Sequence, residues 1–233
     1  MDNTPNNQRP LVFSYLALRK AIGYLGIALP FVVSLGAGII FHKGIQNSIS
    51  AYYHTGMRDV FVGTLWAIGF FLLSYKGYDE RDDIAGTLGC VFAVCMSLFR
   101  TAPDGATSGR VDIIGVFHWI FAALLFLTLI YFSLFLFTKT HADRAPTKQK
   151  LRRNKVFRTC GYAMTICIGL IGIHALLPDD AKSALDALHP VYWLEAIAVE
   201  AFGISWMTKG AAILKDEVLS IPPETTSFAT EKG

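Results

Sequence analysis

The sequence predicts an all-α membrane protein, a bundle of six transmembrane helices with both termini in the cytoplasm. Two observations carry this prediction. Apolar residues make up 53% of the 233 residues and gather in six nearly uncharged runs, whereas a soluble domain does not need repeated runs of about 20 apolar residues. In addition, eight of the 21 Lys and Arg residues crowd between Lys139 and Arg158, which separates two of these runs.

The predicted spans form one domain, residues 21–213, and cover about 21–41, 59–76, 84–99, 112–138, 156–177 and 191–208. The third run has about 16 residues and the fourth about 27, so the third would sit in thinned bilayer and the fourth would tilt. A count of five or seven spans is the alternative.

Segments at both ends of the chain are predicted to lie outside the bilayer. The cytoplasmic segment 1–20 contains the apolar residues 11–18, which are too few to cross and predict a helix lying on the membrane surface. The segment 214–233 mixes charges with paired prolines, which predicts a disordered cytoplasmic tail.

The basic residues assign each connection to a side of the membrane, because Lys and Arg near span ends are retained in the cytoplasm. With six spans, 16 of the 21 bases fall at the two termini and in the second and fourth connections, and five fall on the other side. This distribution predicts a multi-pass protein of a bacterial cytoplasmic membrane. The basic fourth connection would contact anionic lipid headgroups, so it gives no reason to expect nucleic-acid binding.

Small residues recur at four-residue spacing within the runs, which predicts close packing between helices in the membrane. The pairs and triplet are Ser34 and Gly38, Gly63 and Ala67, and Gly161, Thr165 and Gly169.

Polar residues gather on the non-cytoplasmic side, beginning with the segment 48–59 before the second span. If this segment is the α-helical start of that span, Ser50 and His54 share one face, and so do Thr55 and Asp59. The same topology brings other ionisable residues to this layer: Asp112, His118, His174, His189 and Glu195. Ionisable groups within a membrane usually mark a functional site, so this layer is the predicted site.

Imidazole and carboxylate groups together favour zinc as a cofactor. We predict His54, His118 and His174 as ligands, with Asp59 or Asp112 as general base or orienting group and Glu195 as a second candidate base. A zinc ion with one open position lowers the pKa of bound water to about 7 and supplies hydroxide to attack a carbonyl. The predicted activity is hydrolysis of a lipid amide or ester.

A non-catalytic interpretation explains the same residues. Arg58 and Arg100 are ion-pair partners for Asp59 and Asp112, so these acids would only tie loops together. Ser50, Arg58, Arg100, His189 and Glu200 are then candidate binding residues for membrane lipid or another hydrophobic small molecule, in a lipid-binding or scaffold protein.

Two further groups of acids need separate interpretations. Glu200 lies deep in the last span, where it would serve a proton relay in a small proton-coupled transporter or donate a hydrogen bond to Thr64 or Thr165. The acids at 79, 80, 82 and 83 are predicted to form a solvated cytoplasmic turn.

The run from Ser50 to His54 resembles the Ser-x-x-x-His element of the CREST membrane hydrolase superfamily, which includes alkaline ceramidases and adiponectin-receptor-like proteins. The resemblance implies a seven-helix zinc hydrolase acting on lipid amides. Only Ser50 and His54 match; the family's Asp corresponds to Asp79 or to none, and the closing His-x-x-x-His is absent. Residues 52–63 and 74–79 also look like uncharacterised bacterial multi-span proteins, and this likeness implies no activity.

Overall fold

The computed structural model describes residues 9–77, 79–102, 112–140 and 147–214, which form helices and no strand. The six long helices are α1 (Arg9–Phe41), α2 (Arg58–Leu73), α3 (Glu80–Leu98), α4 (Ile113–Tyr131), α5 (Lys148–Ala175) and α7 (Pro190–Lys209). Three short elements join them: the 3₁₀ helix η1 (Ser50–His54), the π-helical turn η2 (Phe132–Leu136) at the end of α4, and α6 (Asp179–Asp186).

The all-α prediction is confirmed, and each of the six apolar runs forms one long helix. Three helical stretches are long and apolar enough to cross a membrane: Leu16–Phe41, Ile113–Leu136 and Lys148–Ala175. Of the other long helices, α2 has only 16 residues, and α3 begins with a charged turn.

The N-terminal surface helix was predicted as a separate element, but residues 11–18 are continuous with the rest of α1. No Gly or Pro occurs between 11 and 22 to end a helix there. Of the predicted tail, only Leu214 lies within the described residues.

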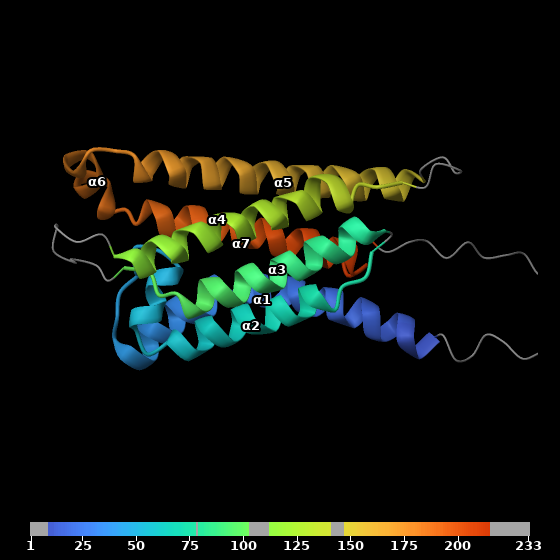
Figure 1. The fold of residues 1–233 in the computed structure, drawn as a ribbon, viewed down its shortest axis with the longest axis horizontal. Helices are drawn as coiled ribbons and strands as arrows, with labels where there is room; N and C mark the ends of the chain where they lie inside the picture. Colours follow the sequence, from blue (N-terminus) through green and yellow to red (C-terminus); the bar gives the residue numbers. More distant parts are fainter. Residues whose placement is uncertain (1–8, 78, 103–111, 141–146, 215–233) are drawn as a thin grey trace, which may run out of the picture.

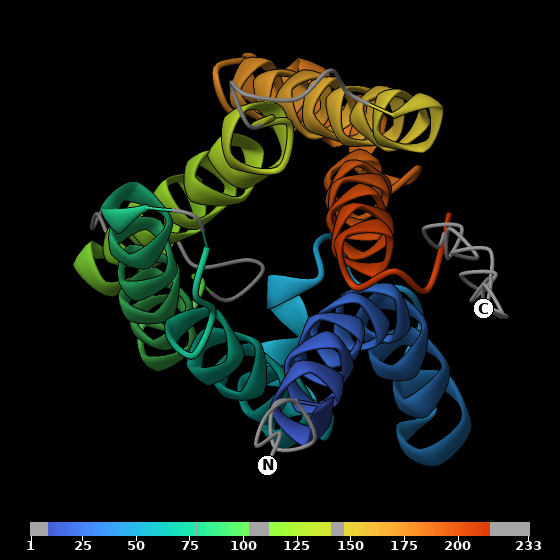
Figure 2. The ribbon, with the colours of Figure 1, turned by 90° about the vertical axis from the view of Figure 1, so that its right-hand side faces the viewer.

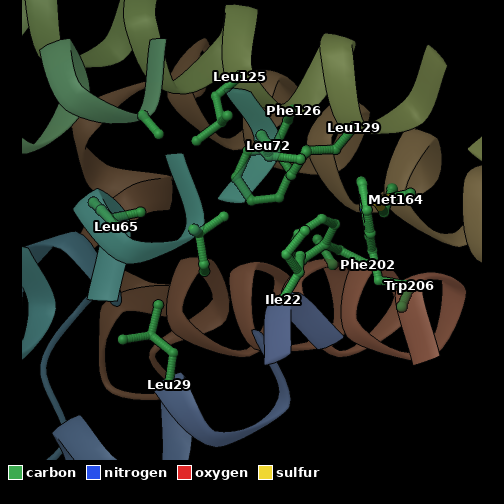
Figure 3. Close-up of a cluster of buried hydrophobic side chains, with 14 of the residues drawn as sticks. Ile22, Leu29, Leu65, Leu72, Leu125, Phe126, Leu129, Met164, Phe202 and Trp206 are labelled. Atoms are coloured by element: carbon green, nitrogen blue, oxygen red, sulfur yellow. The ribbon is translucent and has the colours of Figure 1, made fainter. Parts of the chain in front are cut away.

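The six long helices form a closed ring (Figures 1 and 2). Each helix packs against the next in chain order, and α7 closes the ring by packing against both α5 and α1. Side chains from all six helices meet inside the ring in one apolar core, part of which Figure 3 shows. α7 therefore lies between α1 and α5. One face of α7 points into the core, and the opposite face points to the outside of the ring.

The outside of the ring is apolar as well. Every long helix exposes large hydrophobic side chains, among them Phe31 and Ile39 of α1, Phe70 of α2, Leu98 of α3, Leu127 of α4, Ile166 and Ile173 of α5, and Trp193 and Ile197 of α7. A bundle in water would cover such a surface with polar side chains. The pattern is that of a helix bundle whose surroundings are lipid.

The two ends of the bundle differ in their polar residues. At one end, here called the η1 end, lie η1, α6 and the N-terminus of α7. At the other, here called the basic end, Lys139 follows η2 and α5 begins with its basic turns. Aromatic rings close the core beneath the basic end, where Trp206 meets Tyr75 edge to face at 5.2 Å between ring centroids.

The closest helix contacts differ from the predicted small-residue pairs. A side chain on Gly203 of α7 would meet the Gly23 carbonyl of α1 at 2.8 Å, and one on Gly86 of α3 would meet the Leu72 carbonyl of α2 at 2.5 Å. By contrast, Gly63 and Gly169 face open space, and of the four glycines in the predicted set only Gly161 has a neighbour this close. Four-residue spacing shows that small residues share one face of a helix, but it does not show whether that face packs against a neighbouring helix.

Candidate functional site

Glu195 is the centre of the polar arrangement at the η1 end. Its Oε2 accepts a hydrogen bond from the Ile49 backbone N–H at 2.6 Å, so a side chain of α7 holds the first turn of η1. The Ser50 backbone N–H also faces this carboxyl group. Ser50 and Ser48 share a hydrogen bond between their hydroxyls at 3.0 Å, and Ser48 Oγ also accepts from the Ala51 N–H. The serine-rich segment is therefore docked onto α7 by one acid.

His189 fixes the loop next to Glu195. Its Nδ1 lies 2.9 Å from Asn47 Oδ1, which joins the start of α7 to the segment before η1. Pro190 takes the first position of α7, where the missing N–H is not needed. His189 thus connects two chain segments, and the described residues around it form no cluster of metal-ligating side chains.

The predicted shared face of Ser50 and His54 is wrong, because η1 is a 3₁₀ helix. With three residues per turn, residues three apart eclipse and residues four apart diverge. Ser50 is buried beside Glu195, whereas His54 Nε2 bonds the Thr101 carbonyl at 2.8 Å. Thr55 does not share a helical face with Asp59 either, since it lies before α2 and its hydroxyl donates to the Tyr52 carbonyl.

Two of the predicted histidines meet at the C-terminal end of α3. His118 of α4 is buried, and its Nδ1 bonds the carbonyls of Phe99 at 2.7 Å and Met96 at 3.0 Å. His54 bonds the Thr101 carbonyl in the same stretch of chain. His118 therefore uses one nitrogen on carbonyls that the end of α3 leaves unpaired, and His54 uses one on a carbonyl three residues beyond that end.

The predicted ion pairs are partly formed. Arg100 Nη1 lies 3.6 Å from Asp112 Oδ2, and the other Asp112 carboxyl oxygen caps α4 by accepting from the Ile114 N–H. Arg58 does not pair with Asp59 but lies over the Tyr53 ring at 4.7 Å and donates to its hydroxyl. Asp59 is exposed in the first turn of α2. Both carboxyl oxygens of Asp112 thus take part in structural contacts, one with Arg100 and one with the first turn of α4.

The third predicted ligand, His174, lies in the last turn of α5, and its Nε2 is buried without a hydrogen bond in the described residues. Within these residues, no group of three or more His, Cys, Asp or Glu side chains is placed to hold a metal ion. The structure does not gather His54, His118 and His174 into one centre, so zinc stays a prediction.

A cavity lies inside the ring below Glu195. Its walls come from η1 and five long helices: Leu29, Ile49, Ser50, Phe61, Leu65, Ile68, Met96, Leu125, Phe126, Leu129, Glu195, Val199 and Phe202. Several of these side chains are labelled in Figure 3. The cavity has a volume of about 50 Å³, several times the roughly 10–15 Å³ that one water requires. Only Ser50 and Glu195 provide polar side chains, and both belong to the η1 end.

The basic end holds a charged cluster that the sequence interpretation missed. Asp82 was predicted to be solvated, but its side chain is 0% exposed and lies 2.8 Å from Lys139 Nζ. Lys139 also bonds Asp79, whose other role is to cap α3 by accepting from the Arg81 N–H. The sequence did contain a signal for this cluster. The acids near 80 and the basic fourth connection are predicted on the same side of the membrane, where they can meet.

Comparison with known proteins finds no matching family model, no matching curated protein and no matching solved structure.

Proposed function

We propose that all six long helices span a cytoplasmic membrane, with both termini on the cytoplasmic side. The ring is apolar inside and outside, and its basic residues concentrate at one end, as retention of Lys and Arg in the cytoplasm requires. The η1 end, with Glu195, then faces away from the cytoplasm.

Reporter fusions test this orientation. Alkaline phosphatase joined after Leu188 is expected to be active, and green fluorescent protein joined after Thr140 is expected to fluoresce. The opposite pattern, or activity of the same reporter at both positions, would contradict six spans with cytoplasmic termini.

We further propose that the protein binds a lipid-like molecule inside the ring. The observation that carries this proposal is the cavity, which is apolar along its walls and polar only at Ser50 and Glu195. Ligand pockets combine apolar walls with a few polar groups that fix orientation. The walls are complementary in chemistry to an alkyl or acyl chain, and a hydroxyl or amide N–H at its end would donate to the Glu195 carboxyl group.

Mass spectrometry of gently purified protein tests this function with two matched variants of α4. Leu125 is buried in the cavity wall, whereas Leu127 is 57% exposed on the outside of the same helix. Leu125→Trp fills the cavity and is expected to reduce the bound lipid-like molecule at least about tenfold, whereas Leu127→Trp retains it. Equal retention in both variants, each eluting as a single folded species, would overturn the proposal.

A hydrolase acting on a lipid amide or ester is the second candidate. The arrangement of His54 and His118 favours it, since each binds a backbone carbonyl through one ring nitrogen and makes no bond to a described residue through the other. Histidine ligands in metal sites are oriented in this way. Zinc lost in both His54→Ala and His118→Ala would support this candidate. Wild-type protein that is purified without chelators and contains no zinc would contradict it.

A further inference from the structure

Glu200 faces the opposite side of α7 from Glu195. The cavity inside the ring is lined by Glu195, Val199 and Phe202 of this helix, which recur at spacings of four and three residues and so share one face. A groove on the other side is lined by Trp193, Ala196, Ile197, Glu200 and Ile204, which define a second face by the same periodicity. The two glutamates therefore serve different sites.

The groove runs along the outside of the ring. Its floor is α7, and its walls are Pro30 and Phe31 of α1 on one side and Thr159, Cys160 and Ala163 of α5 on the other. α1 and α5 each pack against α7, which lies between them (Figure 2). The groove has a volume of about 390 Å³. Phe31 and Trp193 at its rim are 55% and 52% exposed, so it opens toward the surrounding lipid.

Glu200 carries an acceptor oxygen that the described residues do not satisfy. Its Oε1 is buried and has no hydrogen bond in the described residues. The predicted bond between Glu200 and Thr165 is not formed in the described residues, where the Thr165 hydroxyl donates to the Gly161 carbonyl on its own helix. The Tyr192 hydroxyl, which also lines the groove, donates to the Pro30 carbonyl. A buried acceptor of this kind favours a ligand that brings its own donor.

The depth of Glu200 limits what that ligand is. Ten residues separate it from Pro190 at the start of α7, which is roughly 15 Å along a helix axis and about half the thickness of the hydrocarbon core. The amine of a phospholipid headgroup stays at the surface. An amine attached directly to a hydrophobic body reaches this depth.

We propose that this groove binds a hydrophobic amine dissolved in the membrane, with its ammonium N–H donating to Glu200. The carboxylate supplies the complementary charge, and the apolar residues of α1, α5 and α7 cover the hydrocarbon part. This site is independent of the cavity at Glu195, because the two lie on opposite faces of α7.

Binding of radiolabelled N,N-dimethyldodecylamine to the protein in lipid nanodiscs tests the proposal. We expect saturable binding that Glu200→Gln weakens by at least about tenfold. Ala196→Leu keeps the carboxyl but fills the groove one turn away, so it should weaken binding similarly. Glu80→Gln makes the same carboxyl-to-amide change at an exposed position of the basic end and should leave binding unchanged.

Three outcomes would overturn this assignment. One is equal affinity of wild type and a folded Glu200→Gln variant for the amine. Another is equally tight binding of dodecyl methyl ether, which has the same chain but neither charge nor N–H donor. The third is a wild-type dimer that dissociates in the Glu200→Gln variant, because the carboxyl would then serve contact between two copies of the chain.

Discussion

Glu195→Ala is expected to release the lipid-like ligand and to loosen η1 at the same time. The substitution removes the acceptor of the Ile49 N–H and one of the two polar side chains of the cavity. Loss of an acceptor from a partly buried donor costs about 1–3 kcal/mol, and ligand retention should fall at least about tenfold. Unfolding in detergent and mass spectrometry of bound lipid measure the two effects separately.

Glu195→Gln is the control that distinguishes these effects. Its amide oxygen still accepts from Ile49, so most of the stability should return, whereas the other carboxyl oxygen, which would accept from the ligand, is replaced by an NH₂ group. A variant with native stability and undiminished lipid would show that the acid only fastens η1.

Lys139→Met is expected to give the second large effect, a loss of about 3 kcal/mol in the free energy of unfolding, because it removes the ammonium group that lies against the buried Asp82 carboxylate. Asp82 is fully buried, and its Oδ2 lies 2.8 Å from Lys139 Nζ. Lys76→Met is the matched control, since it breaks an ion pair with Asp83 whose side chains are 65% and 41% exposed. An exposed pair contributes about 0–1 kcal/mol. Equal stability of the two variants would contradict the role assigned to Lys139.

The stabilisation by Lys139 should also depend on pH. Its hydrogen bond holds the pKa of Asp79 below 3.8. Burial opposes the charge of Lys139, but the bonds to Asp82 and Asp79 outweigh it and raise the Lys139 pKa above 10.5. The lowered pKa contributes stability above about pH 4 that is lost as the pH falls further, and the raised pKa contributes stability below about pH 10 that is lost above it. The difference between wild type and Lys139→Met should therefore be largest between these limits.

The sequence was sufficient to predict the six helices, because long apolar runs separated by charged connections leave few other folds. It did not predict the order of helices around the ring or the contact faces. Gly23 and Gly203 meet although they belong to the first and last long helices, and no local spacing relates them. Burial of Asp82 escaped prediction for the same reason, since its partner is 57 residues away.

The polar residues of the η1 end could be listed from the sequence, but their geometry could not be predicted. These residues do lie at one end of the bundle, as the topology required. The pairing of Ser50 with His54 assumed α-helical geometry, and the 3₁₀ form of η1 turns one toward Glu195 and the other toward Thr101. The sequence singled out Glu195 and Glu200 as candidate residues, but only the structure shows that they occupy opposite faces of α7.

An experimental density map of the protein in lipid, without added ligand, tests the binding function most directly. The predicted result is elongated density inside the ring, between Leu65 and Leu125, with one end within hydrogen-bonding distance of the Glu195 carboxyl. Side chains collapsed into the cavity, or isolated water-sized peaks in place of continuous density, would contradict it.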